Sequence, residues 1–549
     1  MQQFCRQCSA SFQITETAQH LLETVSPVFQ GRTQSIPSPT LCSDCRQQRR
    51  LAFRNLHHLY RNTCGLTGQS LITNIAPDGP LTVFSREVWL GDGWNAQDFA
   101  MDIDATEPFL AQLSSLYRRV PRWANFTERC ENCDFCMNSY GGKDSYLVTS
   151  GGDFERCLFS YRIFKTYDCV DCMNLLQGER CYECIDSEYL HTCTHLQNCK
   201  QCQRCDYCID CSSCQDCLLC VGLRQKRYCI RNQQYTAEAY ERMRAEILRL
   251  HSHADTELQT FAAPLPHPAI HTVACEQVTG DFLTHCKNVS QGYFTSNTED
   301  VTEITDSDHT SLCFSINDGD YYTECIEVAS AAWINHSAFC ENSIHCTDCY
   351  YCSTCANCDY CFCCIGLKRK QYCILNKQYT QGEYEALVPR IIAYMRKTGE
   401  WGEFFPVPLS DHAYNHSLAQ EYFPLTEEQA RERGWRWQPD PERNATDPIP
   451  LPDDIADVSD ALCTSVLTCA ATGRPYKVVK QELAFYRSMG VPVPQFCFDE
   501  RHAQRMRLRR PWKLWARECA KCARPIATSY APERPEIVYC ESCYLAAVY

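Results

Sequence analysis

The most regular pattern along the chain is a small apolar residue, cysteine, at every third position with mostly polar residues between. The stretch NCKQCQRCDYCIDCSSCQDCLLC, residues 198–220, keeps this spacing through eight cysteines. An extended strand sends residues i and i+3 to opposite faces, so an ordinary strand does not produce the pattern. Side chains three residues apart point in the same direction only if the chain has three residues per turn, or if it bends at a corner between them. The pattern predicts a chain with frequent corners.

A longer period links the same cysteines. They stand twelve residues apart at Cys157, Cys169, Cys181, Cys193, Cys205, Cys217 and Cys229. Alternate members share the flanks ERC, QRC and RYC, while those between read YDC, HTC and QDC. This alternation predicts a structural unit of 24 residues. A repeat of that length favours one coil of a parallel β-solenoid over a pair of helices, which usually needs more than about 30 residues.

The array is duplicated. CSSCQDCLLCVGLRQKRYCIRNQQYT, from Cys211, recurs as CANCDYCFCCIGLKRKQYCILNKQYT, from Cys355, with an offset of 144 residues. Each copy ends in an amphipathic helical pattern, at residues 234–248 and 378–391. Thr380 and Glu383 fit a capping box at the start of the second. We therefore expect two solenoid-like arrays, each closed by a helix.

Two pairs of CxxC cysteines stand at each end of the chain. They are Cys5, Cys8, Cys42 and Cys45 at the N-terminus, and Cys519, Cys522, Cys540 and Cys543 at the C-terminus. Two such turns can complete a tetrahedral shell of four thiolates, the usual structural zinc site. Four protein ligands leave no open position for water or substrate, which favours a structural role over catalysis. The spacing predicts two zinc ions.

The two ends are related to each other by an offset of 455 residues, which sets Cys42 on Cys497 and Cys64 on Cys519. Each end then has an intact and a decayed quartet. The decayed ones read Cys64, Thr67, Ser85, Val88 and Cys469, Thr472, Cys497, Glu500. We interpret both ends as copies of one module that originally had two metal sites.

Basic residues follow the knuckles at both ends. They include Arg46, Arg49, Arg50, Arg505, Arg507, Arg509 and Arg510. A zinc knuckle followed by a basic, aromatic helix is a plausible contact for nucleic acid or the ribosome. The alternative is a solvated helix face that balances an acidic protein.

Three interpretations of the triplet cysteines compete. Cysteine is a small, readily buried residue, and positions twelve apart would stack inside the coils as lining. Recurring CxxC pairs could instead hold zinc or iron–sulfur clusters, although no ferredoxin-type C-x3-C-P ending occurs. The third possibility is a disulfide ladder in an exported protein. The spacing favours the lining, with metal as its main rival.

Composition narrows the class of protein. The chain has 549 residues, 44 cysteines and a formal charge of −15. It opens MQQFCRQC, without a secretory signal, and no apolar run approaches the roughly 20 residues of a membrane span. These features predict a cytoplasmic protein with no membrane contact. Neither a GxSxG elbow, a Walker loop nor a GxGxxG fingerprint appears, so a non-catalytic role is favoured.

The N-terminal pattern CRQC–SASFQIT … LCSDCRQQRR resembles a probable zinc-binding domain of many uncharacterised bacterial proteins. The whole layout resembles a family of cysteine-rich proteins from uncultivated bacteria. The matching features are PTLCSDCRQQRRLAFRN, the repeated GL[RK]xKxYCIxNxQYT, and ARECAKC … SYAPERPEIVYCESCY. The resemblance implies zinc at both intact quartets and no defined activity. Ser43 replaces the proline usual in this knuckle and leaves the ligands unchanged.

The sequence thus predicts a mainly β protein: two tandem β-solenoid-like cysteine arrays capped by helices and flanked by zinc-ribbon-like α+β modules. The predicted segments are an N-terminal module (1–90), an acidic connector with an amphipathic helix (91–129), array 1 (130–262), array 2 (263–400), a connector (401–460) and a C-terminal module (461–549). We expect a zinc-binding interaction scaffold. The alternative is a metal or redox protein that holds iron–sulfur or several zinc ions in the central triplets.

Overall fold

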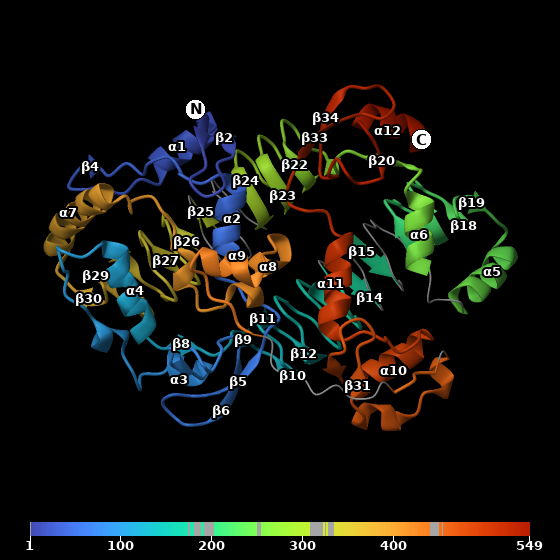
Figure 1. The fold of residues 1–549 in the computed structure, drawn as a ribbon, viewed down its shortest axis with the longest axis horizontal. Helices are drawn as coiled ribbons and strands as arrows, with labels where there is room; N and C mark the ends of the chain where they lie inside the picture. Colours follow the sequence, from blue (N-terminus) through green and yellow to red (C-terminus); the bar gives the residue numbers. More distant parts are fainter. Residues whose placement is uncertain are drawn as a thin grey trace. The chain divides into compact units, whose positions relative to one another are not determined.

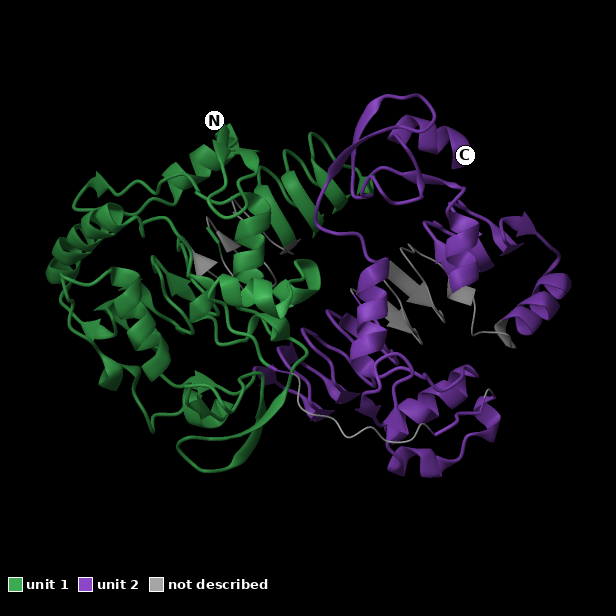
Figure 2. Ribbon diagram, in the orientation of Figure 1, with its two compact units in different colours: residues 1–125, 270–438 green, residues 126–269, 439–549 purple. Residues whose placement is uncertain are grey.

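The chain forms two compact units, which Figure 2 shows in different colours. Unit 1 comprises residues 1–125 and 270–438, and unit 2 comprises residues 126–269 and 439–549. Each unit therefore combines one end module with one cysteine array. The computed structural model describes residues 2–173, 176–179, 188–191, 203–249, 254–307, 322–323, 326–327, 334–439, 449–452 and 454–548. The predicted repeat positions Cys181, Cys193, Cys199, Cys202, Cys313 and Cys325 lie outside these residues.

Both arrays are parallel β-solenoids, which confirms the predicted fold class. Strands pair in parallel with partners twelve residues apart, as in Cys205 with Cys217 and Cys361 with Cys373. One coil therefore contains twelve residues, and the predicted structural unit, which is twice as long, is wrong. In each array the last strand pairs in the antiparallel direction and ends the ladder.

Every third residue of a coil forms a corner in the left-handed backbone region. In one stretch φ lies between 48° and 54° at Arg204, Tyr207, Asp210, Ser213, Asp216 and Leu219. This conformation costs most residues roughly 1–2 kcal/mol, and asparagine and aspartate adopt it most readily. The residue after each corner points inward, and this is where the cysteines stand. Corners three residues apart therefore explain the cysteine triplets.

Charges on one corner explain why the sequence seems to repeat only every second coil. Arg156 ion-pairs with Asp168 in the next coil at 2.5 Å, and Arg204 pairs with Asp216 in the same way. Each of these residues directly precedes an inward cysteine. In both described pairs, an arginine is followed one coil later by an aspartate on the same corner. The sequence repeats every two coils because opposite charges stack, while the backbone repeats every coil.

Inward side chains serve the backbone as well as filling the interior. The Ser145 hydroxyl accepts a hydrogen bond from the N–H of Cys157 at 2.9 Å, and the Cys220 thiol accepts one from the N–H of Asn232 at 3.5 Å. The Cys355 thiol donates to the Ser353 carbonyl at 3.5 Å. A small side chain with a donor and an acceptor therefore suits these positions, because buried backbone groups need partners.

Gly280 marks a shortened coil in array 2. Thr272 pairs with Leu283, eleven residues later, whereas Gly280 pairs with Gly292 at the usual twelve. At Gly280 φ is +139°, and an added Cβ would lie 1.7 Å from the Gly292 carbonyl oxygen. Only glycine fits here, because the backbone of the next coil occupies the space of a side chain.

Unit 2 contains array 1 and the C-terminal module (Figure 1). Its strands are β9 (Thr127–Glu128), β10 (Glu131–Asp134), β11 (Ser139–Tyr140), β12 (Lys143–Tyr146), β13 (Phe164–Tyr167), β14 (Leu176–Glu179), β15 (Glu188–His191), β16 (Gln203–Ile209), β17 (Gln215–Val221), β18 (Arg227–Ile230), β19 (Gln233–Gln234), β20 (Pro266–Pro268), β31 (Leu467–Thr468), β32 (Pro475–Tyr476), β33 (Trp515–Glu518), β34 (Pro525–Thr528) and β35 (Ile537–Tyr539). Its helices are α5 (Ala237–Arg249), α6 (Ala254–Ala262), α10 (Lys480–Met489), α11 (Phe498–Leu508) and α12 (Glu541–Val548). Strand β20, which follows the array, pairs in parallel with β35 of the module.

Unit 1 contains the N-terminal module and array 2. Its module has strands β1 (Gln2–Phe4), β2 (Ser11–Gln13), β3 (Val28–Phe29), β4 (Arg32–Thr33), β5 (Tyr60–Thr63), β6 (Ser70–Thr73), β7 (Val83–Phe84) and β8 (Arg122–Trp123), and helices α1 (Glu16–Thr24), α2 (Ser43–Leu51), α3 (Arg86–Leu90) and α4 (Phe109–Arg119). The array has β21 (Thr272–Val273), β22 (Gly280–Thr284), β23 (Ser290–Ser296), β24 (Thr302–Ser307), β25 (Tyr322–Thr323), β26 (Ile334–Asn335), β27 (Cys346–Thr347), β28 (Asp359–Phe362), β29 (Gln371–Ile374) and β30 (Lys377–Gln378), followed by α7 (Gln381–Thr398), α8 (Leu418–Tyr422) and α9 (Glu427–Glu432).

A helix follows the last strand of each array, as predicted. Helix α7 begins with the expected capping box, in which Thr380 and Glu383 exchange side-chain and backbone hydrogen bonds. Tyr384 of α7 and Tyr240 of α5 occupy equivalent places in the two copies, and both are buried against the end of their array. Within the described residues, every helix is too short or too polar to span a bilayer.

Candidate metal centres

One knuckle geometry recurs four times, in two copies per end module. In each copy the first cysteine donates its N–H to the carbonyl five residues on, at 2.8–2.9 Å, and its carbonyl accepts from the N–H four residues on, at 2.8–2.9 Å. That fourth residue has a positive φ in all copies. The four first cysteines are Cys5, Cys64, Cys469 and Cys519. The shared backbone pattern supports a common origin of all four.

A short helix supplies the second half of every knuckle. Cys42, Ser85 and Cys497 are the N-cap residues of α2, α3 and α11, and α12 begins directly after Cys540. Each position thus lies at the positive end of a helix, where the dipole and the free N–H groups stabilise the thiolate of a cysteine. The paired arrangement of a tight turn and a helix N-terminus brings the ligand positions together.

The N-terminal quartet lies entirely within unit 1. The Sγ atoms of Cys5, Cys8, Cys42 and Cys45 all lie within 4.8 Å of one another. Cys8 and Cys42 are separated by 3.6 Å between sulfurs. The hydrogen bond between the thiols of Cys45 and Cys42 lowers the pKa of Cys42 to about 5 and raises that of Cys45. Cys42 is therefore a thiolate at neutral pH, the form that binds metal.

The C-terminal quartet has the same construction in unit 2. The Sγ atoms of Cys519, Cys522, Cys540 and Cys543 also lie within 4.8 Å of one another, and Cys522 and Cys540 are 3.8 Å apart. Burial raises the pKa of Cys519, but backbone N–H groups outweigh it and lower the pKa to about 6. The N–H of Cys540 donates one of these bonds at 3.2 Å.

The two decayed quartets keep the knuckle but lose ligands. In the first, the N–H of Ser85 donates to the Cys64 thiol at 3.4 Å, and Val88 has no donor atom for a metal. In the second, the Thr472 hydroxyl lies 3.9 Å from the Cys497 thiol. Neither set belongs to the groups of three or more ligand atoms found within 4.8 Å among the described residues.

The described triplet cysteines lie inside the coils. Cys217, Cys352 and Cys355 are fully buried, and no disulfide joins the described cysteines. Their thiols donate to carbonyl groups of the same coil and of the next, at 3.5 Å for Cys352 to Cys361. No described array thiol belongs to a group of three or more potential ligands within 4.8 Å. This geometry matches the lining interpretation, since each thiol already has a structural role.

The arginines that were expected to form basic surface patches are mostly buried. Arg46, Arg49, Arg50, Arg505, Arg509 and Arg510 are buried, and of the seven predicted arginines only Arg507 is exposed, with 63% of its side chain accessible. Arg49 pairs with Glu327 at 3.0 Å and with Glu403 at 2.8 Å. The six buried arginines lie inside their units and do not offer a surface to nucleic acid. A nucleic-acid or ribosomal partner stays a prediction.

Acidic residues of the arrays bind the buried arginines of helices α2 and α11, and the sequence pattern does not single them out. Glu303, Glu327 and Asp171 are corner residues of the arrays, with positive φ, and lie far along the chain from the arginines that they bind. Nothing local distinguishes them from other acidic corner residues. One signal in the sequence pointed to a shared role of these arginines: they recur in both end modules at an offset of 455 residues.

Comparisons with family models, with curated proteins and with solved structures find no match to this chain. The resemblance to cysteine-rich bacterial proteins therefore stays a prediction. The geometry defines two tetrathiolate groups that could each hold a metal ion, one in each unit.

Proposed function

We propose that the chain is a zinc-stabilised, non-catalytic scaffold with one zinc ion in each end module. The observation that carries this proposal is the spacing of the sulfur atoms, 3.6 Å between Cys8 and Cys42 and 3.8 Å between Cys522 and Cys540. A tetrahedral shell with Zn–S bonds of about 2.3 Å places its sulfurs roughly 3.8 Å apart. Four thiolates also suit a soft ion and exclude magnesium and calcium.

A structural role follows from the closed shell. All four positions around the ion would be taken by protein sulfur, so no position remains for water or substrate. In unit 1 the metal ligand Cys42 caps helix α2, and in unit 2 the module that holds the metal also contains helix α11; buried arginines of both helices bind the array of their unit. Zinc would therefore hold the module in the shape that fits the solenoid. The reducing cytoplasm is the proposed location, because thiols persist there.

The scaffold role implies a macromolecular partner. Solenoids present long, regular surfaces that suit such partners. The proposal no longer assigns RNA or the ribosome to the six buried arginines. Whether RNA binds elsewhere is tested by a binding assay with total RNA at low salt, in which a salt-dependent complex supports that partner and its absence contradicts it.

The first experiment is metal analysis of the chain purified without oxygen. We expect two zinc ions and no iron per polypeptide. Cys5→Ser and Cys543→Ser should each lose one ion, because each removes a ligand from one quartet. Cys64→Ser is the matched control: it alters the same knuckle geometry at a decayed site and should keep both ions. Loss of neither ion in the first two variants would contradict the assignment.

The same measurement tests the alternative in which the central triplets hold metal. A brown protein with iron, or five or more zinc ions per chain, would support that alternative. The fully buried array thiols and their bonds to carbonyl groups favour two ions. Free thiols in the remaining cysteines after denaturation would agree with the lining.

A further inference from the structure

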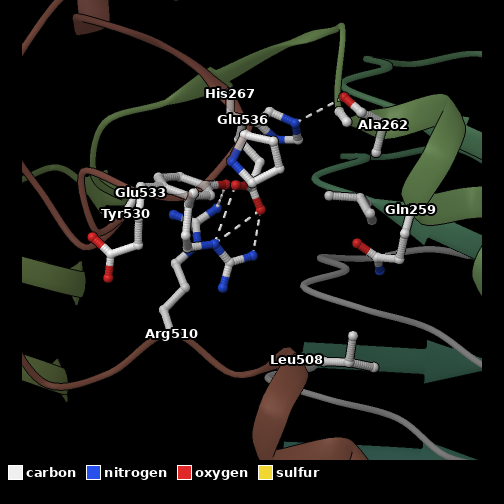
Figure 3. Close-up of a pocket in the computed structure, with 12 residues that line it drawn as sticks. Gln259, Ala262, His267, Leu508, Arg510, Tyr530, Glu533 and Glu536 are labelled. Carbon is white, nitrogen blue, oxygen red and sulfur yellow. Dashed lines mark hydrogen bonds and ion pairs between the residues drawn. The ribbon is translucent and has the colours of Figure 1, made fainter.

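A cavity of about 350 Å³ lies within unit 2, between helix α6, strand β20 and the loop that precedes β35 (Figure 3). Four separate segments of the chain line it, from array 1 to the C-terminal module. Its apolar lining consists of Ile209, Ala262, Ala263, Leu508 and Pro535. A cavity of about 150 Å³ already holds benzene in a protein interior. This cavity is therefore large enough for a molecule of two fused rings.

His267 gives the cavity a defined polar group. The residue is 3% exposed, and its Nε2 lies 3.0 Å from the Ala262 carbonyl oxygen. A carbonyl can only accept, so Nε2 must be the nitrogen that carries the proton. Burial and the nearby Arg510 lower the pKa of His267, which keeps the ring neutral. Nδ1 is then a bare acceptor.

The Nδ1 atom of His267 is buried and has no hydrogen-bond partner in the structure. A buried acceptor without a partner costs free energy, and native proteins rarely leave one. A ligand in the cavity could supply the missing donor.

The charges of the lining indicate which ligand fits. Two arginines and two glutamates line the cavity, so their formal charges cancel. Arg534 binds Glu536 through Nε at 3.0 Å, and Arg510 donates to the Tyr530 hydroxyl while lying over its ring, 4.2 Å from the centroid. Figure 3 shows Arg510 and Tyr530 on the opposite side of the cavity from Gln259. A compensated lining favours a neutral ligand over an anion or a cation, because burying an uncompensated charge is costly.

We propose that this cavity is a binding site for a small, neutral, mostly apolar molecule that presents one N–H or O–H donor to Nδ1 of His267. The site does not depend on the proposed function, although the loop 530–536 that lines it leads through β35 to the metal ligand Cys540. Polar groups set the orientation of the ligand, and the apolar residues provide most of the contact area, as in other ligand pockets.

The test uses two matched probes on the full metal-loaded chain. Indole has one N–H donor, and 1-methylindole has the same rings without it. By titration calorimetry we expect one indole per chain, with a Kd at least tenfold lower than that of 1-methylindole. His267→Leu should weaken indole to the level of 1-methylindole, whereas His20→Leu, an exposed histidine in unit 1, should change neither.

A second measurement needs no variant, in case His267→Leu disturbs the fold. In ¹⁵N spectra of the histidine-labelled wild-type chain, one unprotonated imidazole nitrogen should shift upfield with indole and stay in place with 1-methylindole. The proposal is overturned if neither probe binds, which would leave water as the only occupant. It is also overturned if both bind equally, or if the anion benzoate binds more tightly than indole.

Discussion

Arg501 lies 3.2 Å from the carboxylate of Asp171, and both side chains are almost completely buried. The ion pair joins helix α11 of the C-terminal module to a corner of array 1 within unit 2. Arg46, which stands at the corresponding place in the N-terminal module, makes the equivalent contact with the corner residue Glu303 in unit 1. The same helix thus fixes the same kind of module to the same kind of solenoid in both units, with a different acidic residue as partner.

Loss of the Asp171 charge should destabilise unit 2. Arg505 also lies 3.2 Å from this carboxylate, so Asp171→Asn would leave two buried guanidinium groups with less counter-charge. Breaking a buried pair in this way costs about 3 kcal/mol. We expect a fall of that size in the free energy of urea unfolding. Asn tolerates the positive φ of this corner, so the loss can be assigned to charge.

The control for this variant is Asp168→Asn, one corner away on the same array. Asp168 pairs with Arg156 on the surface, where 51% of the arginine side chain is exposed. Exposed pairs contribute less than about 1 kcal/mol. Equal losses in the two variants would show that the corner position, rather than the buried charge, determines the effect.

Glu341 should make unit 1 less stable as the pH rises. Burial, with a contribution from Asp411, raises its pKa to about 7, while the Ser353 hydroxyl opposes the shift. In the unfolded chain a glutamate ionises near pH 4.3. Between these values the folded state holds a proton that the unfolded state has lost, so stability decreases with pH and becomes constant above about pH 7. At about 1.4 kcal/mol per pKa unit, the difference between the two pKa values corresponds to a loss of roughly 3–4 kcal/mol, most of it between pH 5 and pH 8.

Urea unfolding at pH 5 and pH 8 measures this loss. Glu341→Gln cannot ionise and should remove it, which makes the variant more stable than the wild type at pH 8. Glu432→Gln changes an exposed carboxylate in α9 and should leave the pH dependence unaltered. A wild-type chain whose stability is the same at both values would contradict the role of Glu341.

A branched residue at an exposed corner should be unfavourable for steric reasons alone. Asn357 has a φ of 53° and its side chain is exposed. Asn357→Val should cost roughly 1–2 kcal/mol, whereas Asn357→Gly should stay within about 1 kcal/mol of the wild type. Thr347→Val, in the extended strand β27, is the control and should be nearly neutral. Thermal unfolding of the wild type and the three variants measures these effects. An Asn357→Val variant as stable as the wild type would contradict the corner geometry.

Alkylation should distinguish the first coil of array 1 from its interior. Cys133 is partly exposed, and a hydrogen bond with the Cys136 thiol lowers its pKa to about 7. Cys157 and Cys169 are fully buried. Iodoacetamide at pH 7.5 should therefore label Cys133 well before the other two, as peptide mass spectrometry would show. All three should react alike in denatured protein, and similar rates in the folded chain would contradict the buried lining.

The sequence was sufficient for the class of fold and for the grouping of the terminal cysteines, because both depend on spacing along the chain. The period of the backbone was harder to obtain. Arg156 and Asp168 differ in charge but occupy the same corner in successive coils. The residue types alone therefore suggested a repeating unit of 24 residues, twice the length of one coil. The place of Arg46 could not be predicted either, because its partner Glu303 is 257 residues away and an arginine run looks the same on a surface as in an interface.

The corner at every third residue also constrains how such a gene can change in length. Adding or removing one whole coil returns each following cysteine to the interior, and the offset between the two arrays corresponds to twelve coils. An insertion of a single codon would instead turn the next inward residues out to solvent. The coil that ends at Gly280 is one residue shorter than the other described coils. This loss is tolerated because Gly280 and Gly292 let the two neighbouring coils approach each other closely. Solenoids of this type should therefore differ among relatives by multiples of twelve, with glycine at each departure.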